Sequence, residues 1–211
     1  MNPFNILEKI FVTGERTFCT PRLIKFKPLF PTPIGSILNF ITSKERLQIW
    51  DEIKNIPHVS HKAIEGDGYS THGKDVRFLD RNRKIKDRIQ TALDEYNETC
   101  GNFPSKITDI WSNIQNSGSK LNQHSHPGVN ISGALYINVG EDDKIYFHNP
   151  NQYVYFMSKK NSTPYNYETS WILVHNCQLI LFPSWLRHGN DNVINKMDER
   201  IVISFNSLDR Q

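Results

Sequence analysis

Residues 122–138 read NQHSHPGVNISGALYIN, and this stretch decides the class of fold. In its second half the apolar residues Ile131 and Ile137 share one parity, while smaller or polar residues take the other. Alternation with a period of two predicts a β-strand with one apolar face. The first half carries His124 and His126, two residues apart and on the polar parity. The stretch therefore predicts a strand whose polar side carries two histidines.

Strand-like runs separated by Gly, Asn, Asp and Pro fill the rest of the C-terminal half. They are ITDIWSNIQ (107–115), KIYFHN (144–149), YVYFMS (153–158), SWILVH (170–175), CQLILFPS (177–184) and ERIVISFNS (199–207). Helical spacing of apolar residues predicts helices from Ser43 to about residue 55 and from about residue 82 to 99. A further strand is expected within LFPTPIGSILNF (29–40). Helices followed by many short strands indicate a mainly β protein of jelly-roll type, with the N-terminal helices packed on one face.

The length of the chain limits its domain organisation. With 211 residues, of which 37% are hydrophobic, the chain is long enough for one domain with a core and short for two. We expect a single domain over residues 1–211. Residues 1–106 would form an N-terminal extension with the supporting helices, beginning with an irregular, proline-rich stretch to about Pro33, and residues 107–208 would form the jelly-roll core.

The charge and the cysteine content exclude several classes of function. The 25 Lys and Arg against 22 Asp and Glu leave a net charge of +3 without a concentrated basic tract, which argues against a nucleic-acid partner. The three cysteines, Cys19, Cys100 and Cys177, are widely spaced and form neither a disulfide framework nor a zinc motif. No apolar run approaches the roughly 20 residues of a membrane span. We therefore expect a cytoplasmic protein without a membrane partner.

His124 and His126 indicate a metal site. In an extended segment, residues i and i+2 project from the same side about 6.6 Å apart, so both side chains can reach one ion. Neutral imidazole is a good ligand for iron, zinc or copper. The best placed third ligand is His188, at the exit of the most apolar strand of the chain. The plainer interpretation is that these histidines are ordinary surface or core residues.

Arg200 lies at the head of the apolar run RIVISFN, twelve residues after His188. An arginine at the start of a core strand is costly unless its guanidinium group meets an anion, ideally a carboxylate held by two hydrogen bonds. The anion is either a bound organic acid next to the metal or a structural partner such as Asp198 or Glu199. The sequence leaves both interpretations open.

Several motifs in this order resemble a known family. They are the H-x-H-P element at residues 124–127, SGALYIN (132–138), the G…IYFHNP run ending at residue 150, LILFPSWLRH (179–188) and RIVISFN (200–206). The pattern is similar to that of the 2-oxoglutarate and iron(II)-dependent oxygenases known mainly from bacterial and phage genomes. The resemblance covers roughly residues 105–207, and its second block, FPSWL-x-H followed by the arginine strand, is the more distinctive.

The resemblance implies a double-stranded β-helix, a variant of the jelly roll, that binds Fe(II) and uses 2-oxoglutarate as co-substrate. It makes His188 the distal metal ligand and Arg200 the anchor for the far carboxylate of 2-oxoglutarate. Further polar residues are candidates for completing the co-substrate or substrate pocket. They are Asn130, Tyr136, Ser204 and Asn206.

This chain departs from the pattern of the wider superfamily at one ligand position. The usual metal site has an acid two residues after the first histidine, where this chain has His126, and no Asp or Glu occurs between Trp111 and Val139. Two assignments follow: a site of His124, His126 and His188, or a site of His126 and His188 with one coordination position left open. The missing carboxylate raises the net charge of the site by one unit, and zinc would also suit three imidazoles.

The implied reaction consumes oxygen and 2-oxoglutarate, releases succinate and carbon dioxide, and hydroxylates a C–H bond of an unidentified substrate, such as a peptide side chain or a small metabolite. The alternative is a jelly-roll binding module for carbohydrate or a virion surface, in which the histidines hold a structural metal or none. Arg200 favours the enzyme, because a binding module has no need of an arginine one strand away from a histidine cluster.

Overall fold

The computed structural model describes residues 29–73, 82–156, 158–190 and 193–210. The expected irregular stretch before residue 29 and Cys19 lie outside these residues. Contacts between Cα atoms gather Thr32–Gln211 into one compact unit. The boundary between an extension and a core at residue 106 stays a prediction.

Two helices form where the apolar spacing predicts them. Helix α1 (Ser43–Lys54) is capped by Thr42, one residue before the expected Ser43: the Thr42 hydroxyl accepts from the Glu45 N–H at 3.2 Å and the Glu45 carboxylate accepts from the Thr42 N–H at 2.9 Å. Helix α3 (Arg83–Cys100) ends at Gly101, whose φ of +70° lies in the left-handed region that glycine adopts without strain. Both ends thus follow from local sequence.

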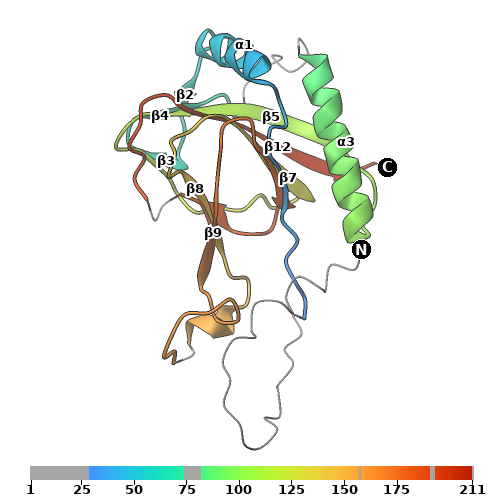
Figure 1. The fold of residues 1–211 in the computed structure, drawn as a ribbon, viewed down its shortest axis with the longest axis vertical. Helices are drawn as coiled ribbons and strands as arrows, with labels where there is room; N and C mark the ends of the chain where they lie inside the picture. The colour runs from blue at the N-terminus through green and yellow to red at the C-terminus, as the bar shows by residue number, and fades with distance from the viewer. Residues whose placement is uncertain (1–28, 74–81, 157, 191–192, 211) are drawn as a thin grey trace, which may run out of the picture. The chain divides into compact units, whose positions relative to one another are not determined.

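The strands form antiparallel sheets of seven, three and two strands (Figure 1). The strands are β1 (Gly35–Ile37), β2 (Val59–Ser60), β3 (Ile64–Glu65), β4 (Gly68–Ser70), β5 (Ser105–Gln115), β6 (Lys120–Leu121), β7 (Ile131–Asn138), β8 (Lys144–His148), β9 (Thr169–Leu173), β10 (Leu179–Pro183), β11 (His188–Gly189) and β12 (Arg200–Asp209). The large sheet has the order β1-β10-β7-β12-β5-β4-β2, the second β11-β8-β9, and the third β3-β6. Long-range antiparallel pairing thus makes the protein mainly β.

One strand prediction is wrong. Residues 153–158, YVYFMS, were expected to form a strand, but the 3-10 helix η3 (Gln152–Tyr155) occupies their start. The Asn151 side chain accepts from the Tyr153 N–H at 3.1 Å and so begins a turn. Tyr153 and Phe156 are 80% and 84% exposed. Aromatic residues that face water have no core to hold them in a strand, so local hydrogen bonds decide the conformation.

The two faces of β7 and β12 bury different kinds of side chain. Ile131, Leu135 and Ile137 of β7 join a core cluster with apolar residues of α1 and α3, so both helices lie against this face (Figure 1). The opposite parity, represented by Ala134 and Tyr136, belongs to a second cluster shared with the three-stranded sheet. The alternation seen in the sequence is therefore real, and its less apolar side faces the space between the two sheets.

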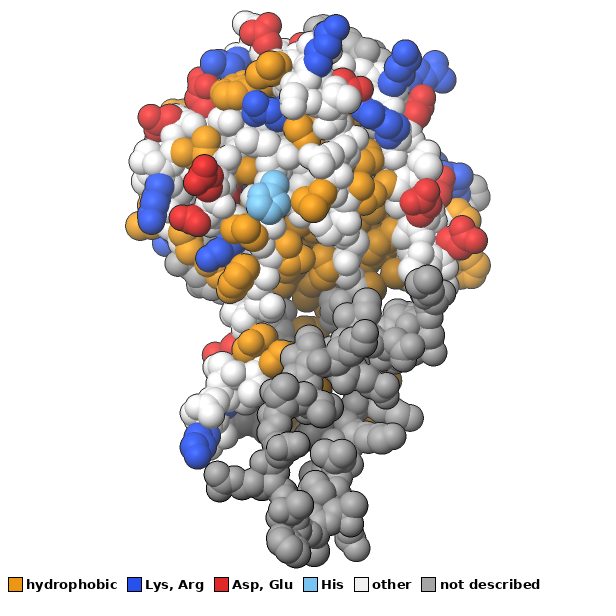
Figure 2. Space-filling model, in the orientation of Figure 1, with side chains coloured by type: hydrophobic (Ala, Val, Ile, Leu, Met, Phe, Trp, Pro, Cys, Tyr) orange, Lys and Arg blue, Asp and Glu red, His pale blue; other side chains and the backbone are white. Residues whose placement is uncertain are grey.

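The surface has no single dominant charge on the face drawn in Figure 2, where acidic and basic side chains alternate around the helices. This distribution agrees with the small net charge of +3. Within the described part of the chain, no helix combines the length and the apolar character that crossing a membrane requires.

Candidate metal centre

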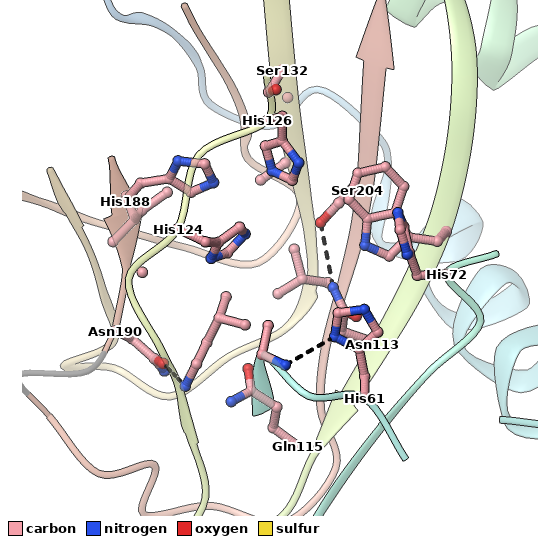
Figure 3. A pocket seen from close by; sticks show the side chains of 18 of the residues that line it. His61, His72, Asn113, Gln115, His124, His126, Ser132, His188, Asn190 and Ser204 are labelled. Carbon is pink, nitrogen blue, oxygen red and sulfur yellow. Dashed lines mark hydrogen bonds between the residues drawn. The ribbon is translucent and has the colours of Figure 1, made fainter. Parts of the chain in front are cut away.

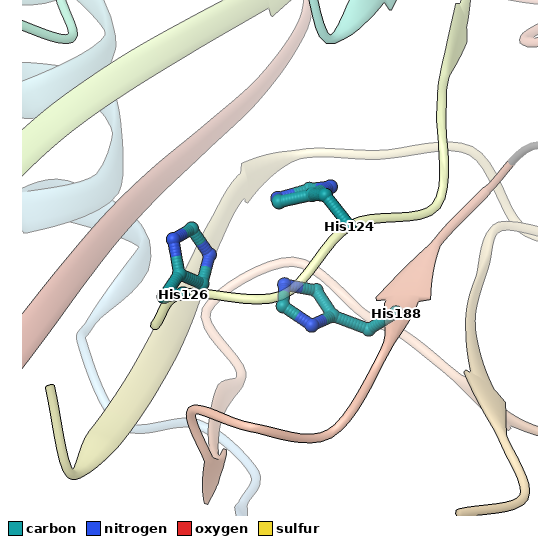
Figure 4. Close-up of side chains that lie close together, drawn as sticks. All are labelled: His124, His126 and His188. Carbon is teal, nitrogen blue, oxygen red and sulfur yellow. The ribbon is translucent and has the colours of Figure 1, made fainter. Parts of the chain in front are cut away.

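Three histidines converge in the space between the sheets. His124 and His126 come from the segment that precedes β7, and His188 begins β11 (Figure 4). One ring nitrogen from each of the three lies within 4.8 Å of the others. Ligand atoms this close can reach a single ion placed between them. The structure therefore brings together all three histidines that the sequence singled out.

The backbone fixes two of these residues against each other. The His124 N–H donates to the His188 carbonyl and the His188 N–H donates to the His124 carbonyl, both at 2.9 Å. The segment approaches closely because Gly189 follows His188: a Cβ atom there would lie 2.8 Å from the Leu121 carbonyl oxygen and 3.0 Å from that of Asn122. A side chain at this position would push the His124 segment away. The glycine is thus part of the metal centre although it has no ligand atom.

Backbone carbonyls also set the ring orientation of two ligands. His124 Nδ1 lies 2.8 Å from the Asn122 carbonyl oxygen, and His188 Nδ1 lies 2.8 Å from that of Leu186. A carbonyl oxygen can only accept, so each Nδ1 must carry the proton and each Nε2 must keep its lone pair. Both rings are held in the tautomer that offers Nε2 to a metal.

Burial keeps the three rings neutral. It lowers the pKa of His188 to about 3 and that of His126 to about 4, and neighbouring histidines add to both effects. Burial also lowers the pKa of His124, although the bond to the Asn122 carbonyl opposes the effect. At neutral pH none of the three rings has to lose a proton before it binds a cation.

The donor set fits a divalent transition metal. Three neutral imidazoles are suitable ligands for iron(II) or zinc, and they leave the remaining coordination positions to other molecules. Among the described residues, no Asp or Glu lines the surrounding cavity. The site therefore differs from the usual arrangement of two histidines and one carboxylate, as the sequence predicted.

The histidines line a cavity of about 250 Å³ that reaches from β12 to the segment before β3 (Figure 3). Of the predicted pocket residues, Tyr136, Ser204 and Arg200 line it. Asn130 does not: it is exposed and its amide donates to Asp209. Asn206 is buried outside the cavity lining and accepts from the Ser132 hydroxyl at 2.8 Å. Three of the five predicted pocket residues therefore line the cavity, and two do not.

Arg200 has a structural partner, although not one that the sequence suggested. Its Nε donates to Asp143 Oδ2 at 2.6 Å and its Nη1 donates to Gln115 Oε1 at 2.8 Å. Asp198 instead accepts from the Ser117 N–H, and Glu199 pairs with Lys54 at 3.0 Å. Asp198 and Glu199 are the two neighbours of Arg200 along the chain, and β12 directs the guanidinium group away from both.

Sequence reasoning missed several residues of the cavity. Trp111, Asn113 and Gln115 share one parity of β5 and all line the cavity. Two polar side chains on one face of a core strand were a usable signal, because burying them is costly without partners. Two further histidines also line the cavity: His61, which precedes β3, and His72, which follows β4. No spacing rule links these two to the later histidines.

Comparison with known proteins finds a family that resembles the segment around this site. Residues 109–206, which hold the three histidines and Arg200, match the family described as "Putative 2OG-Fe(II) oxygenase". This segment is therefore similar to the 2OG-Fe(II) oxygenases. Proteins of this description use iron and 2-oxoglutarate, the metal and the co-substrate that the sequence motifs implied. His61 and His72 lie outside the matched residues. No curated protein matches the sequence.

Solved structures share the fold of this chain. A prolyl-4-hydroxylase from Pseudomonas putida has a TM-score of 0.57 and 12% identity, covering 85% of this chain and 94% of that one. The α-ketoglutarate-dependent epimerase SnoN from nogalamycin biosynthesis has a TM-score of 0.61 and 11% identity, covering 84% and 77%. HygX from Streptomyces hygroscopicus, with nickel and 2-oxoglutarate bound, has a TM-score of 0.54 and 13% identity, covering 84% and 83%. At these identities the likeness concerns the fold alone.

Proposed function

We propose that the protein is a hydroxylase that holds iron(II) on His124, His126 and His188 and anchors 2-oxoglutarate on Arg200. The observation that carries the proposal is that three converging imidazoles and a buried arginine line one cavity. Its substrate would be a peptide side chain or a small metabolite.

The two facing sheets support a double-stranded β-helix, and the free Cys100 and Cys177 support a reducing, cytoplasmic setting.

Different residues of the cavity would bind the metal, bind the co-substrate and exclude water. When bound, iron(II) and 2-oxoglutarate supply the chemistry that uses oxygen to oxidise a C–H bond, releasing succinate and carbon dioxide. The protein holds the metal through neutral imidazoles and offers the Arg200 guanidinium group to the far carboxylate of the co-substrate. Phe182 packs its ring 4.5 Å from that of His188 and screens this ligand from water. Trp111, whose ring centroid lies 5.7 Å from that of His126, also lines the cavity.

An anaerobic titration tests the proposal. The purified protein is loaded with iron(II), 2-oxoglutarate is added, and a weak visible charge-transfer band is expected, since the co-substrate would bind the metal directly. The control variant is His175→Ala, because His175 is exposed and outside the cavity; it should give the same band. A folded, iron-loaded protein that shows no band at saturating 2-oxoglutarate would contradict the proposal.

A further inference from the structure

The inner end of the cavity contains a buried amide donor without a partner. Gln115 is 1% exposed and its Oε1 accepts from Arg200 Nη1 at 2.8 Å, while its Nε2 has no hydrogen-bond partner among the described residues. The same residue lines the cavity (Figure 3). A buried donor left unpaired destabilises the folded protein, so its presence calls for an explanation.

The orientation of this amide is fixed by its neighbour. Arginine has only donors, so the side-chain oxygen of Gln115 must face the guanidinium group and the NH₂ group must point elsewhere. Rotating the amide by half a turn would place two donors against each other. The contact with Arg200 therefore fixes which end of the amide is oxygen and which is nitrogen, and the nitrogen is the end without a partner.

Arg200 itself has one side still open. Asp143 holds its Nε at 2.6 Å, Gln115 holds its Nη1, and no described residue accepts from its Nη2. Asp143 is in turn held in place, because its other oxygen accepts from the Lys144 N–H at 2.8 Å. The ring centroid of Tyr136 lies 6.0 Å from the guanidinium carbon. The arginine is thus clamped on two sides, with its third edge free for a ligand.

Resting on the proposed function, we propose that Gln115 is a second anchor for the co-substrate and that its Nε2 donates to the same distal carboxylate as Arg200. A carboxylate has two oxygens and accepts several hydrogen bonds, so it can satisfy both the open arginine edge and the unpaired amide. Asp143 already balances the charge of Arg200. The NH₂ group of Gln115 therefore adds a neutral hydrogen-bond donor beside the guanidinium group. A 2-oxo acid that lacks a distal carboxylate leaves this NH₂ group without a partner.

The inference predicts that Gln115 discriminates between 2-oxo acids. Loss of a hydrogen bond to a charged group weakens binding by about ten- to a hundredfold. Gln115→Met should therefore bind 2-oxoglutarate at least tenfold more weakly than the wild type. Gln115→Glu keeps the acceptor for Arg200 but replaces the donor with a negative oxygen, so its loss should be larger. Pyruvate has the same 2-oxo acid end without the distal carboxylate, and its affinity should change less than threefold in both variants.

The deciding measurement follows the amide itself. In ¹⁵N-labelled, zinc-loaded protein, the side-chain NH₂ signals of Gln115 are assigned in the wild type and checked by their absence in Gln115→Glu. Saturating 2-oxoglutarate should shift one of these signals downfield, whereas pyruvate should leave both in place. A residue that only orients Arg200 would lower affinity without moving its own NH₂ signals. The control is Gln178, a buried amide that already donates to Ser36.

The outcomes separate this inference from the proposed function. If 2-oxoglutarate binds but the Gln115 signals do not move, or if Gln115→Met binds it as the wild type does, Gln115 is not an anchor and the oxygenase assignment is unaffected. If the metal-loaded wild type binds no 2-oxoglutarate, both the proposed function and the inference are overturned.

Discussion

Two groups of histidines line the same cavity and differ in whether their ring nitrogens converge on one point. His124, His126 and His188 are buried or half-buried, and their ring nitrogens converge. His61 is half-buried and His72 is exposed, and their ring centroids lie 5.2 Å apart in an edge contact. The first group has the positions of metal ligands, whereas the second forms part of the cavity mouth.

The two groups also come from different parts of the chain. The converging histidines lie within residues 109–206, which match the oxygenase family, while His61 and His72 lie before them. The mouth is connected to the metal centre through Trp111, whose ring lies 4.8 Å from that of His72 and 5.7 Å from that of His126. The histidines of the metal centre and those of the mouth therefore come from two different segments of the chain.

The largest expected effect is the loss of metal when a converging histidine is removed. His188→Ala should reduce bound iron or zinc to near background, because two remaining imidazoles hold the ion much less tightly, while circular dichroism should retain the strand signal. His124→Ala decides between the two ligand assignments: full metal retention would favour a site of His126 and His188 alone. His175→Ala is the matched control, and metal content is measured by elemental analysis after dialysis.

Arg200 gives the next largest effect. Removing one partner of a buried ion pair costs about 3–5 kcal/mol, so Arg200→Ala should bind 2-oxoglutarate about two to four powers of ten more weakly while retaining its metal. Calorimetric titration of the manganese-loaded protein measures this.

The same variant should also be less stable, since the half-buried Asp143 carboxylate is left without its partner. Arg200→Met combined with Asp143→Asn should recover stability in urea but not the affinity for 2-oxoglutarate. Equal co-substrate binding by wild type and Arg200→Ala would reduce Arg200 to a structural residue.

A smaller effect concerns stability against pH in the metal-free protein. The folded state holds His188 neutral with a pKa near 3, whereas the unfolded chain binds a proton near pH 6.5. Between these values the unfolded state binds more protons, so stability should fall as the pH falls below about 6.5, by up to about 1.4 kcal/mol per pH unit for this residue. His188→Gln should lose less stability between pH 7 and pH 5 than the wild type, as measured by urea unfolding with chelator present. An unchanged pH dependence would show that His188 does not contribute.

The smallest effect is expected at the mouth. His72→Ala should leave metal content unchanged and alter 2-oxoglutarate affinity by less than about threefold, because among the described residues its exposed ring packs on Trp111 and His61. His61→Ala should behave in the same way. Elemental analysis and calorimetry measure both quantities. A loss of metal comparable to that of His188→Ala would remove the distinction between the two groups.

The sequence was informative where a single local pattern determined the structure. Helix α1 and helix α3 followed from apolar spacing, and the parity of β7 predicted which of its sides is the more apolar. The convergence of His124, His126 and His188 was predictable because the first two are two residues apart in an extended segment and the third follows the most apolar run of the chain. These features depend on short segments with one dominant physical requirement.

Features that depend on contacts between distant segments were not predictable. Asp143 stands in the acidic run Glu141–Asp143, where nothing distinguishes it from its neighbours, yet the loop before β8 brings it to Arg200. Asn206 shares parity with Arg200, but it lies six residues further along β12, where its side chain accepts from Ser132 of β7. Asn130 precedes β7 by one residue and there turns to the surface. Parity indicates a face but not a position along it.

The reciprocal backbone hydrogen bonds between His124 and His188 bear on the rate at which the protein exchanges its metal. Because the two ligands are held together by the main chain and not by the ion, the empty site keeps its shape, and rebinding does not wait for the chain to reorganise. An ion that dissociates should therefore be replaced at a rate limited by entry into the cavity. The metal that the protein carries would then follow the supply of ions around it more quickly than in a site that folds only on binding.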